Sequence, residues 1–73
     1  MSVKLGTTIK QLREAKCLSR EEFAKKIKRT ENYIYLLESD KRQPRVSGLE
    51  QIAKVLGLSI AEIFTEAEKE SKK

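Results

Sequence analysis

Histidine is absent from this sequence of 73 residues, and cysteine occurs once, as Cys17. Without histidine, the chain lacks the commonest general base and the commonest metal ligand of proteins. A lone cysteine forms neither an internal disulfide nor a cysteine-based metal site, and here it has no histidine partner to activate it. The carboxylates are scattered and show no paired arrangement. We therefore predict that the protein is not an enzyme and binds no cofactor or metal.

Long apolar runs and aromatic side chains are also scarce. No apolar run approaches the roughly 20 residues of a transmembrane helix, and no charged-then-apolar signal segment opens the chain. Aromatic residues make up 5% of the sequence, and the β-branched runs that mark strands are missing. These absences predict a cytoplasmic, all-α protein with a single domain over residues 1–73, small enough for dimerisation to help its stability.

Positive charge is abundant and unevenly placed. The formal net charge is +5; up to Arg45 there are 12 Lys/Arg and 6 Asp/Glu, and from Val46 onward there are 4 and 5. An excess of +6 followed by a remainder of −1 favours one face made for a polyanion. By composition alone, lysines that merely solvate a helical surface explain this excess equally well.

Apolar residues at helical spacing predict a compact bundle of about five short helices. The first helix has an apolar face and ends near Lys16. A capping box at Ser19-Arg20-Glu21-Glu22 opens the second, because the serine hydroxyl can accept the third amide N–H while Glu22 reaches back. Thr30 can cap a third helix, from Glu31 to Glu38.

The second half of the chain carries two further helices. A loop from Asp40 to Pro44 precedes a fourth helix, which begins at Val46 or Ser47 and is capped at its end by Gly57. A second capping box, Ser59-Ile60-Ala61-Glu62, opens a fifth helix. After Thr65 the chain is rich in Glu and Lys, so we expect a core over residues 5–64 and a charged, fraying tail over 65–73.

Residues 23–37 combine a short helix, a tight turn and a second short helix. Ala24 lies where two helix axes would cross closely, and Ile27, Ile34 and Leu37 supply apolar contacts that hold the helices at a steep angle. In such a helix-turn-helix, the second helix projects from the body and can enter a major groove of DNA.

Four motifs extend this pattern: Ile-x-x-Leu-Arg at 9–13, Leu-Ser-x-Glu-Glu-Phe-Ala at 18–24, Glu38 with Lys41-Arg42-x-Pro44, and Ile-Ala-x-x-Leu-Gly at 52–57. In this order and spacing, the segment from Leu5 to Phe64 resembles the lambda-repressor/Cro-like helix-turn-helix family of the XRE type. The resemblance implies a DNA-binding domain in which the third helix reads bases.

Four positions depart from the family pattern. Cys17, Lys28 and Asp40 stand where the family usually has glycine in a left-handed conformation, which other residues tolerate less well. Arg29 stands where the family usually buries a small apolar residue. We therefore expect the turn to be reshaped.

The resemblance also implies which residues contact DNA. It assigns base reading to exposed positions of the third helix, with Asn32 as the best single candidate because its amide can pair bidentately with adenine; these positions are Glu31, Asn32, Tyr33, Tyr35 and Leu36. It assigns contacts with phosphates or with the minor groove to Arg20, Thr30, Lys41, Arg42 and Arg45. Arg20 replaces a glutamine that many members of the family have.

Each of these assignments has a rival. Glu31 is equally suited to stabilise the first turn of its helix, the exposed tyrosines and Leu36 could form a protein-binding patch, and each basic residue could be a solvated surface charge. The resemblance further implies a structural pair, Arg13 with Glu38, linking the first and third helices. If both side chains faced solvent instead, the pair would contribute roughly 0–1 kcal/mol.

The sequence therefore predicts a sequence-specific transcriptional regulator. We expect a repressor that binds a palindromic operator in double-stranded DNA as a homodimer, with promoter occupancy as its whole mechanism because no effector domain follows. The dimer surface is expected near the fourth and fifth helices, at Val55, Ile60 and Phe64. The alternative is a protein-interaction module on the same fold, such as an antitoxin bound to a cognate toxin, with DNA binding secondary.

Overall fold

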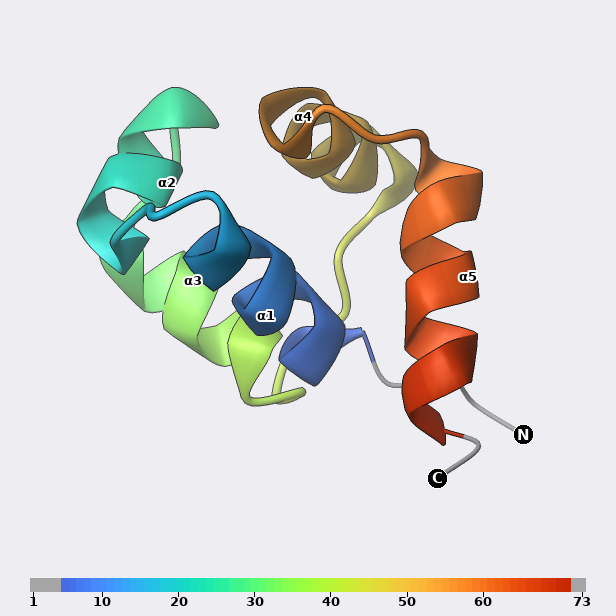
Figure 1. Cartoon of the computed structure of the whole chain (residues 1–73). Helices are drawn as coiled ribbons and strands as arrows, with labels where there is room; N and C mark the ends of the chain where they lie inside the picture. Colours follow the sequence, from blue (N-terminus) through green and yellow to red (C-terminus); the bar gives the residue numbers. More distant parts are fainter. Residues whose placement is uncertain (1–4, 72–73) are drawn as a thin grey trace.

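The computed structural model describes residues 5–71 and contains five α-helices, with no strand in this range. They are α1 (Gly6–Ala15), α2 (Arg20–Lys26), α3 (Glu31–Glu38), α4 (Val46–Leu56) and α5 (Ile60–Ser71). Helix α1 lies between the α2–α3 pair on one side and α5 on the other, and α4 covers one end (Figure 1). None of these helices is long and apolar enough to cross a lipid bilayer. The predicted all-α bundle is confirmed.

A single core joins the helices, and each of them contributes a side chain with no solvent exposure. These side chains are Ile9, Phe23, Ile34, Ile52 and Ile63. Burying one such side chain contributes roughly 1.5–3 kcal/mol. Because every helix supplies one, no helix can leave the bundle without exposing apolar surface.

Both predicted capping boxes are present. At the start of α2 the Ser19 hydroxyl accepts the Glu22 N–H at 3.1 Å, and the Glu22 carboxylate accepts the Ser19 N–H at 3.1 Å. This hydrogen bond from the Ser19 backbone lowers the pKa of the Glu22 carboxyl below its usual value. Ser59 and Glu62 repeat the arrangement at the start of α5. Local sequence alone therefore starts these two helices.

Helix α5 continues through the region after Thr65, where the charged composition predicts a fraying tail, and it extends to Ser71. Ala67 lies one turn beyond Ile63 and is 1% exposed, so the packed face of the helix continues. The predicted fraying of the tail over residues 65–73 stays a prediction; the charge pattern gave no indication of the packed Ala67. Residues 72–73 lie outside the described part.

The first four helices all end in a Schellman motif, in which a left-handed residue turns the chain and the next N–H bonds back to a carbonyl five residues earlier. The left-handed residues are Cys17, Lys28, Asp40 and Gly57, with φ of 58°, 58°, 59° and 72°. The returning hydrogen bonds measure 2.8–3.2 Å from nitrogen to oxygen. They run from the N–H groups of Leu18, Arg29, Lys41 and Leu58 to the carbonyls of Arg13, Ala24, Leu36 and Ala53, in that order. The expected reshaping of the turn is therefore wrong. The three non-glycine residues adopt the left-handed conformation at a steric cost of roughly 1–2 kcal/mol each.

Asp40 has a second function at its turn. Its carboxylate accepts the Gly6 N–H at 2.9 Å and so caps α1, whose own N-cap residue, Leu5, has no side-chain cap. The two backbones meet closely there, since a Cβ on Gly6 would lie 2.5 Å from the Glu38 carbonyl oxygen. The start of α1 thus packs against the end of α3. The positive end of one helix dipole therefore lies beside the negative end of the other.

The left-handed turns give opposite predictions for two substitutions. Lys28→Gly should raise the free energy of unfolding by about 0.5–1 kcal/mol, because relief of left-handed strain exceeds the added chain entropy of glycine. Gly57→Ala should lower it by a similar amount, because the new Cβ would meet only the Lys16 Nζ at 3.9 Å and the cost is conformational. Urea unfolding at unchanged m-value measures both. Equal signs for the two variants would contradict the assignment.

Candidate nucleic-acid interface

Helix α3 turns one face into the core and the opposite face outward. Ile34, Leu37 and Glu38 are buried, whereas Glu31 and Asn32 are exposed. The Thr30 hydroxyl accepts the Tyr33 N–H at 3.1 Å, which is the predicted N-cap. Phe23 and Ala24 of α2 are buried where α2 packs against α3. The first turn of α3 is therefore presented to solvent by a fixed support.

The five residues assigned to base reading divide into two groups. Glu31 and Asn32 are exposed and Leu36 is half-buried, which places them on the outward side of α3. Tyr35 is 42% exposed. Tyr33 is half-buried like Leu36, but it differs because it packs against the core cluster. The structure thus brings four of the five to the surface and sets Tyr33 at its edge.

A buried carboxylate holds α3 to the two helices that precede it. Arg13 Nε lies 2.6 Å from Glu38 Oε2, and the side chains are 8% and 2% exposed. The same guanidinium donates to Glu38 Oε1 at 3.3 Å and to the Leu18 carbonyl at 2.6 Å. The pair implied by the family resemblance therefore lies inside the fold, where a charge is tolerated only with close partners.

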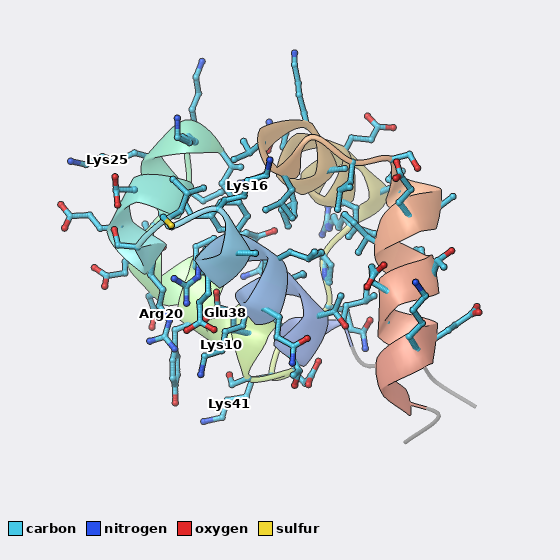
Figure 2. The ribbon with its side chains drawn as sticks, viewed as in Figure 1. Lys10, Lys16, Arg20, Lys25, Glu38 and Lys41 are labelled. Atoms are coloured by element: carbon cyan, nitrogen blue, oxygen red, sulfur yellow. The ribbon has the colours of Figure 1, made fainter. Side chains whose placement is uncertain are left out.

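Sequence reasoning missed a third member of this cluster. Arg20 Nε donates to Glu38 Oε1 at 3.0 Å, and its side chain remains 36% exposed (Figure 2). The only signal in the sequence was that a charged residue replaces the glutamine of many relatives. Arg20 is thus part of the support of α3 as well as a surface cation.

Both tyrosines of α3 carry cations over their rings. The distances from the cationic centre to the ring centroid are 5.2–5.6 Å, within the range of cation–π attraction; Arg20 and Lys41 lie over Tyr35, and Arg29 and Arg42 lie over Tyr33. Arg29, which replaces a small buried residue of the family, is exposed and uses the Tyr33 ring instead of a place in the core. These contacts were not foreseen.

A polar hollow of about 290 Å³ adjoins Tyr33 at the start of α4. It is lined by Arg29, Tyr33, Arg42, Gln43, Arg45, Ser47 and Gly48. Arg45 is the N-cap residue of α4, which has no side-chain cap and no acidic residue in its first turn. The predicted minor-groove residue therefore lies in a positively charged recess beside α3.

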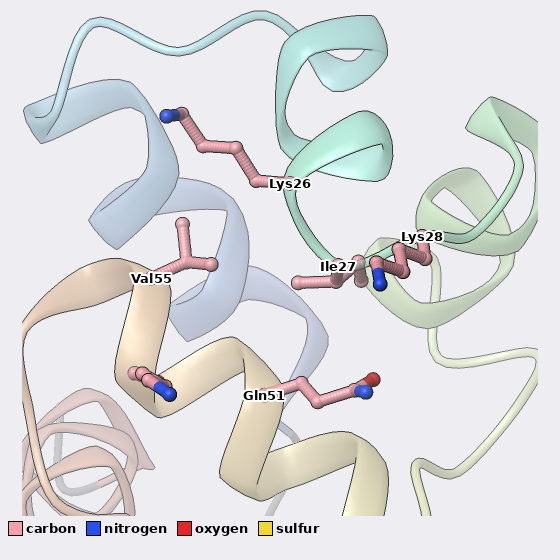
Figure 3. Close-up of a pocket in the computed structure, with 6 residues that line it drawn as sticks. Lys26, Ile27, Lys28, Gln51 and Val55 are labelled. Carbon is pink, nitrogen blue, oxygen red and sulfur yellow. The ribbon is translucent and has the colours of Figure 1, made fainter.

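A second hollow, of about 460 Å³, lies between the end of α2 and α4 (Figure 3). Its lining combines three lysines with apolar and amide side chains: Lys26, Ile27, Lys28, Gln51, Lys54 and Val55. On α4 and α5, Val55 and Ile60 are half-buried against the core, and Phe64 is 36% exposed. Of the residues assigned to a dimer surface, Phe64 is thus the most accessible.

The chain is similar to known helix-turn-helix proteins. A family model described as a helix-turn-helix domain matches residues 4–63. Control protein C.MunI of Mycoplasma sp is 35% identical over 71 residues, which cover 96% of each chain. The HTH-type transcriptional regulator PuuR of Escherichia coli is 36% identical over 64 residues, but these span 35% of its length.

Two solved structures are similar in fold and in sequence. The restriction-modification controller protein C.Esp1396I superposes with a TM-score of 0.84 at 31% identity, covering 97% of this chain and 91% of its own. SinR, a master regulator for biofilm formation solved in complex with DNA, gives a TM-score of 0.77 at 30% identity, covering 82% of this chain and 97% of its own. These relatives are regulators of the helix-turn-helix type.

The buried cluster predicts unequal losses for its two arginines. Arg13→Ala should lower the free energy of unfolding by about 3 kcal/mol, because it leaves the buried Glu38 carboxylate with one partly exposed partner. Arg20→Ala should cost about 1 kcal/mol or less, since that pair is partly solvated. Denaturant unfolding of both variants is the measurement. A small loss in Arg13→Ala would mean that Glu38 is solvated in solution.

Proposed function

The chain belongs to the lambda-repressor/Cro-like helix-turn-helix family, and we propose that it is a transcriptional repressor that binds a palindromic operator as a homodimer. One observation carries this proposal. The exposed face of α3 is held outward by the Arg13–Glu38–Arg20 cluster and is flanked by cations from the segments before and after it. A rigid helix with a polar face and flanking positive charge suits a major groove.

In the proposed complex, bases and phosphates are contacted by different residues. Asn32, exposed in the first turn of α3, is suited to pair with adenine, and Leu36 can contact a thymine methyl. Lys41 and Arg42, exposed in the loop after α3, would neutralise phosphates. Arg45, at the start of α4, would reach the adjacent minor groove. Occupancy of a promoter by this domain would then exclude RNA polymerase.

Two of the similar proteins are controller proteins. C.MunI is 35% identical to this chain, and C.Esp1396I is 31% identical with a TM-score of 0.84. We therefore propose that the chain regulates transcription as a small controller protein, of the kind that C.Esp1396I is for a restriction-modification system. Selection of bound duplexes from random DNA, and a search for the selected site upstream of the protein's own gene, test this proposal.

We expect DNA binding to weaken steeply as the salt concentration rises. On its best selected site, log K should fall linearly with log[salt], with a slope of about −0.9 for each phosphate contacted. The +6 excess up to Arg45 makes several such contacts available. A fluorescence-anisotropy titration at several salt concentrations measures the slope. A flat response, with a stable complex formed by a neighbouring gene's product, would favour the antitoxin alternative.

The proposed homodimer places an exposed residue of α5 at its interface. Phe64 is exposed on α5, one turn after the half-buried Ile60, and we propose that it packs against its counterpart in a second copy. Phe64→Glu should shift sedimentation equilibrium toward monomer and weaken operator binding, because two charges would face each other in an apolar contact. Thr65→Glu, at an exposed neighbouring position, is the matched control. A wild-type monomer at operator-binding concentrations would contradict the proposal.

A further inference from the structure

The outward face of α3 consists of a narrow stripe bordered by two aromatic rings. Successive helical residues are rotated by roughly 100°, so Tyr33 and Tyr35 lie about 200° apart, on the two sides of the helix. Asn32 and Leu36, one turn apart, lie between them on the side opposite the buried Ile34. The tyrosines therefore border the stripe and do not lie at its centre.

Each ring gathers cations from two separate segments of the chain. Arg20 of α2 and Lys41 of the loop after α3 lie 5.5 and 5.6 Å from the Tyr35 centroid. Arg29 of the turn before α3 and Arg42 of the loop after it lie 5.3 and 5.2 Å from that of Tyr33. Two like charges repel when they converge, and the attraction of each cation to the negative face of the ring offsets that repulsion.

Within the described part of the chain, three of these four cations form no ion pair with a carboxylate. Among residues 5–71, the ion pairs involve Arg20 but not Arg29, Lys41 or Arg42. The contacts that the structure shows for these three side chains are with the tyrosine rings. The polar hollow of about 290 Å³ beside Tyr33 adds Arg45 to this surface. Such a concentration of uncompensated charge favours an anionic ligand on each side of the stripe.

We propose that Tyr33 and Tyr35 are positioning residues, each of which holds two cations for the phosphate strand on its side of the groove. This inference rests on the proposed DNA binding and reassigns both tyrosines from the base reading expected for them. The major groove is about 12 Å wide, and a helix lying in it has one phosphate backbone on each side. Cations ordered beforehand lose less conformational freedom on binding, so the rings raise affinity without reading sequence.

A double-mutant cycle tests this proposal. Tyr33→Leu removes the ring but retains an apolar side chain against the core, and it should weaken binding about 5- to 30-fold on every operator variant. In a protein that already carries Arg29→Gln and Arg42→Gln, the same change should cost less than about twofold, because the ring has no cations left to hold. Tyr33→Phe keeps the ring and should bind within about twofold of wild type in either background.

Asn32→Ala is the matched control on the same helix. Its loss should be equal in both backgrounds and should fall on one base position, since it removes a base contact. Equal losses from Tyr33→Leu in both backgrounds, or a changed base preference in that variant, would overturn the proposal. So would Tyr33→Phe binding as weakly as Tyr33→Leu, because the hydroxyl would then be the active group.

The exposed tyrosine provides a second cycle in case Tyr33→Leu lowers stability. Tyr35 is 42% exposed, so Tyr35→Leu combined with Lys41→Gln repeats the test away from the core. Additive losses there would contradict the proposal in the same way. A wild-type protein that shows no salt-dependent, sequence-selective binding would overturn the proposed function itself. If the wild type binds DNA in that way but the losses in both mutant cycles are additive, only the inference about the tyrosines is overturned.

Discussion

The geometry of the proposed reading helix depends on one buried carboxylate. The side chain of Glu38 is 2% exposed, and both its oxygens are occupied by arginines from α1 and α2. A charge at this depth is tolerated only with close partners, and removing one of them costs more than the pair contributes in net stability. The cluster therefore determines where α3 lies relative to α1 and α2 more than it adds to the stability of the fold.

The end of α3 is held a second time by backbone contacts. Gly6 lies against the last turn of α3, where the carbonyl of Glu38 leaves no room for a Cβ. Asp40 then caps α1 with its carboxylate, so a residue that is strained at φ 59° also supplies a hydrogen bond that glycine could not. Asp40 in place of glycine thus adds backbone strain but also adds a hydrogen bond between two helices. It does not reshape the turn.

Features set by neighbouring residues could be predicted from the sequence, whereas features set by tertiary contacts could not. The capping boxes at Ser19 and Ser59 and the bounds of α3 follow from local chemistry, and the structure reproduces them. The burial of Ala67 on α5 could not be predicted in this way, because it is a tertiary effect. The second partner of Glu38, Arg20, lies 18 residues away in the sequence. The contacts of Arg29 and Arg42 with the Tyr33 ring span shorter separations, but they run from a turn and a loop where no helical periodicity predicts them.

Arg20 connects the support of α3 to the surface proposed to bind DNA. Its Nε is bound to Glu38 while its side chain stays 36% exposed and lies over the Tyr35 ring. The planar guanidinium can bond to one partner through Nε and present its terminal nitrogens to another, which a glutamine in this position could not do with a charge. A phosphate at Arg20 would therefore meet a cation already oriented by a buried carboxylate and a ring. The contact that holds α3 in place and the contact that would hold the DNA strand thus share one side chain.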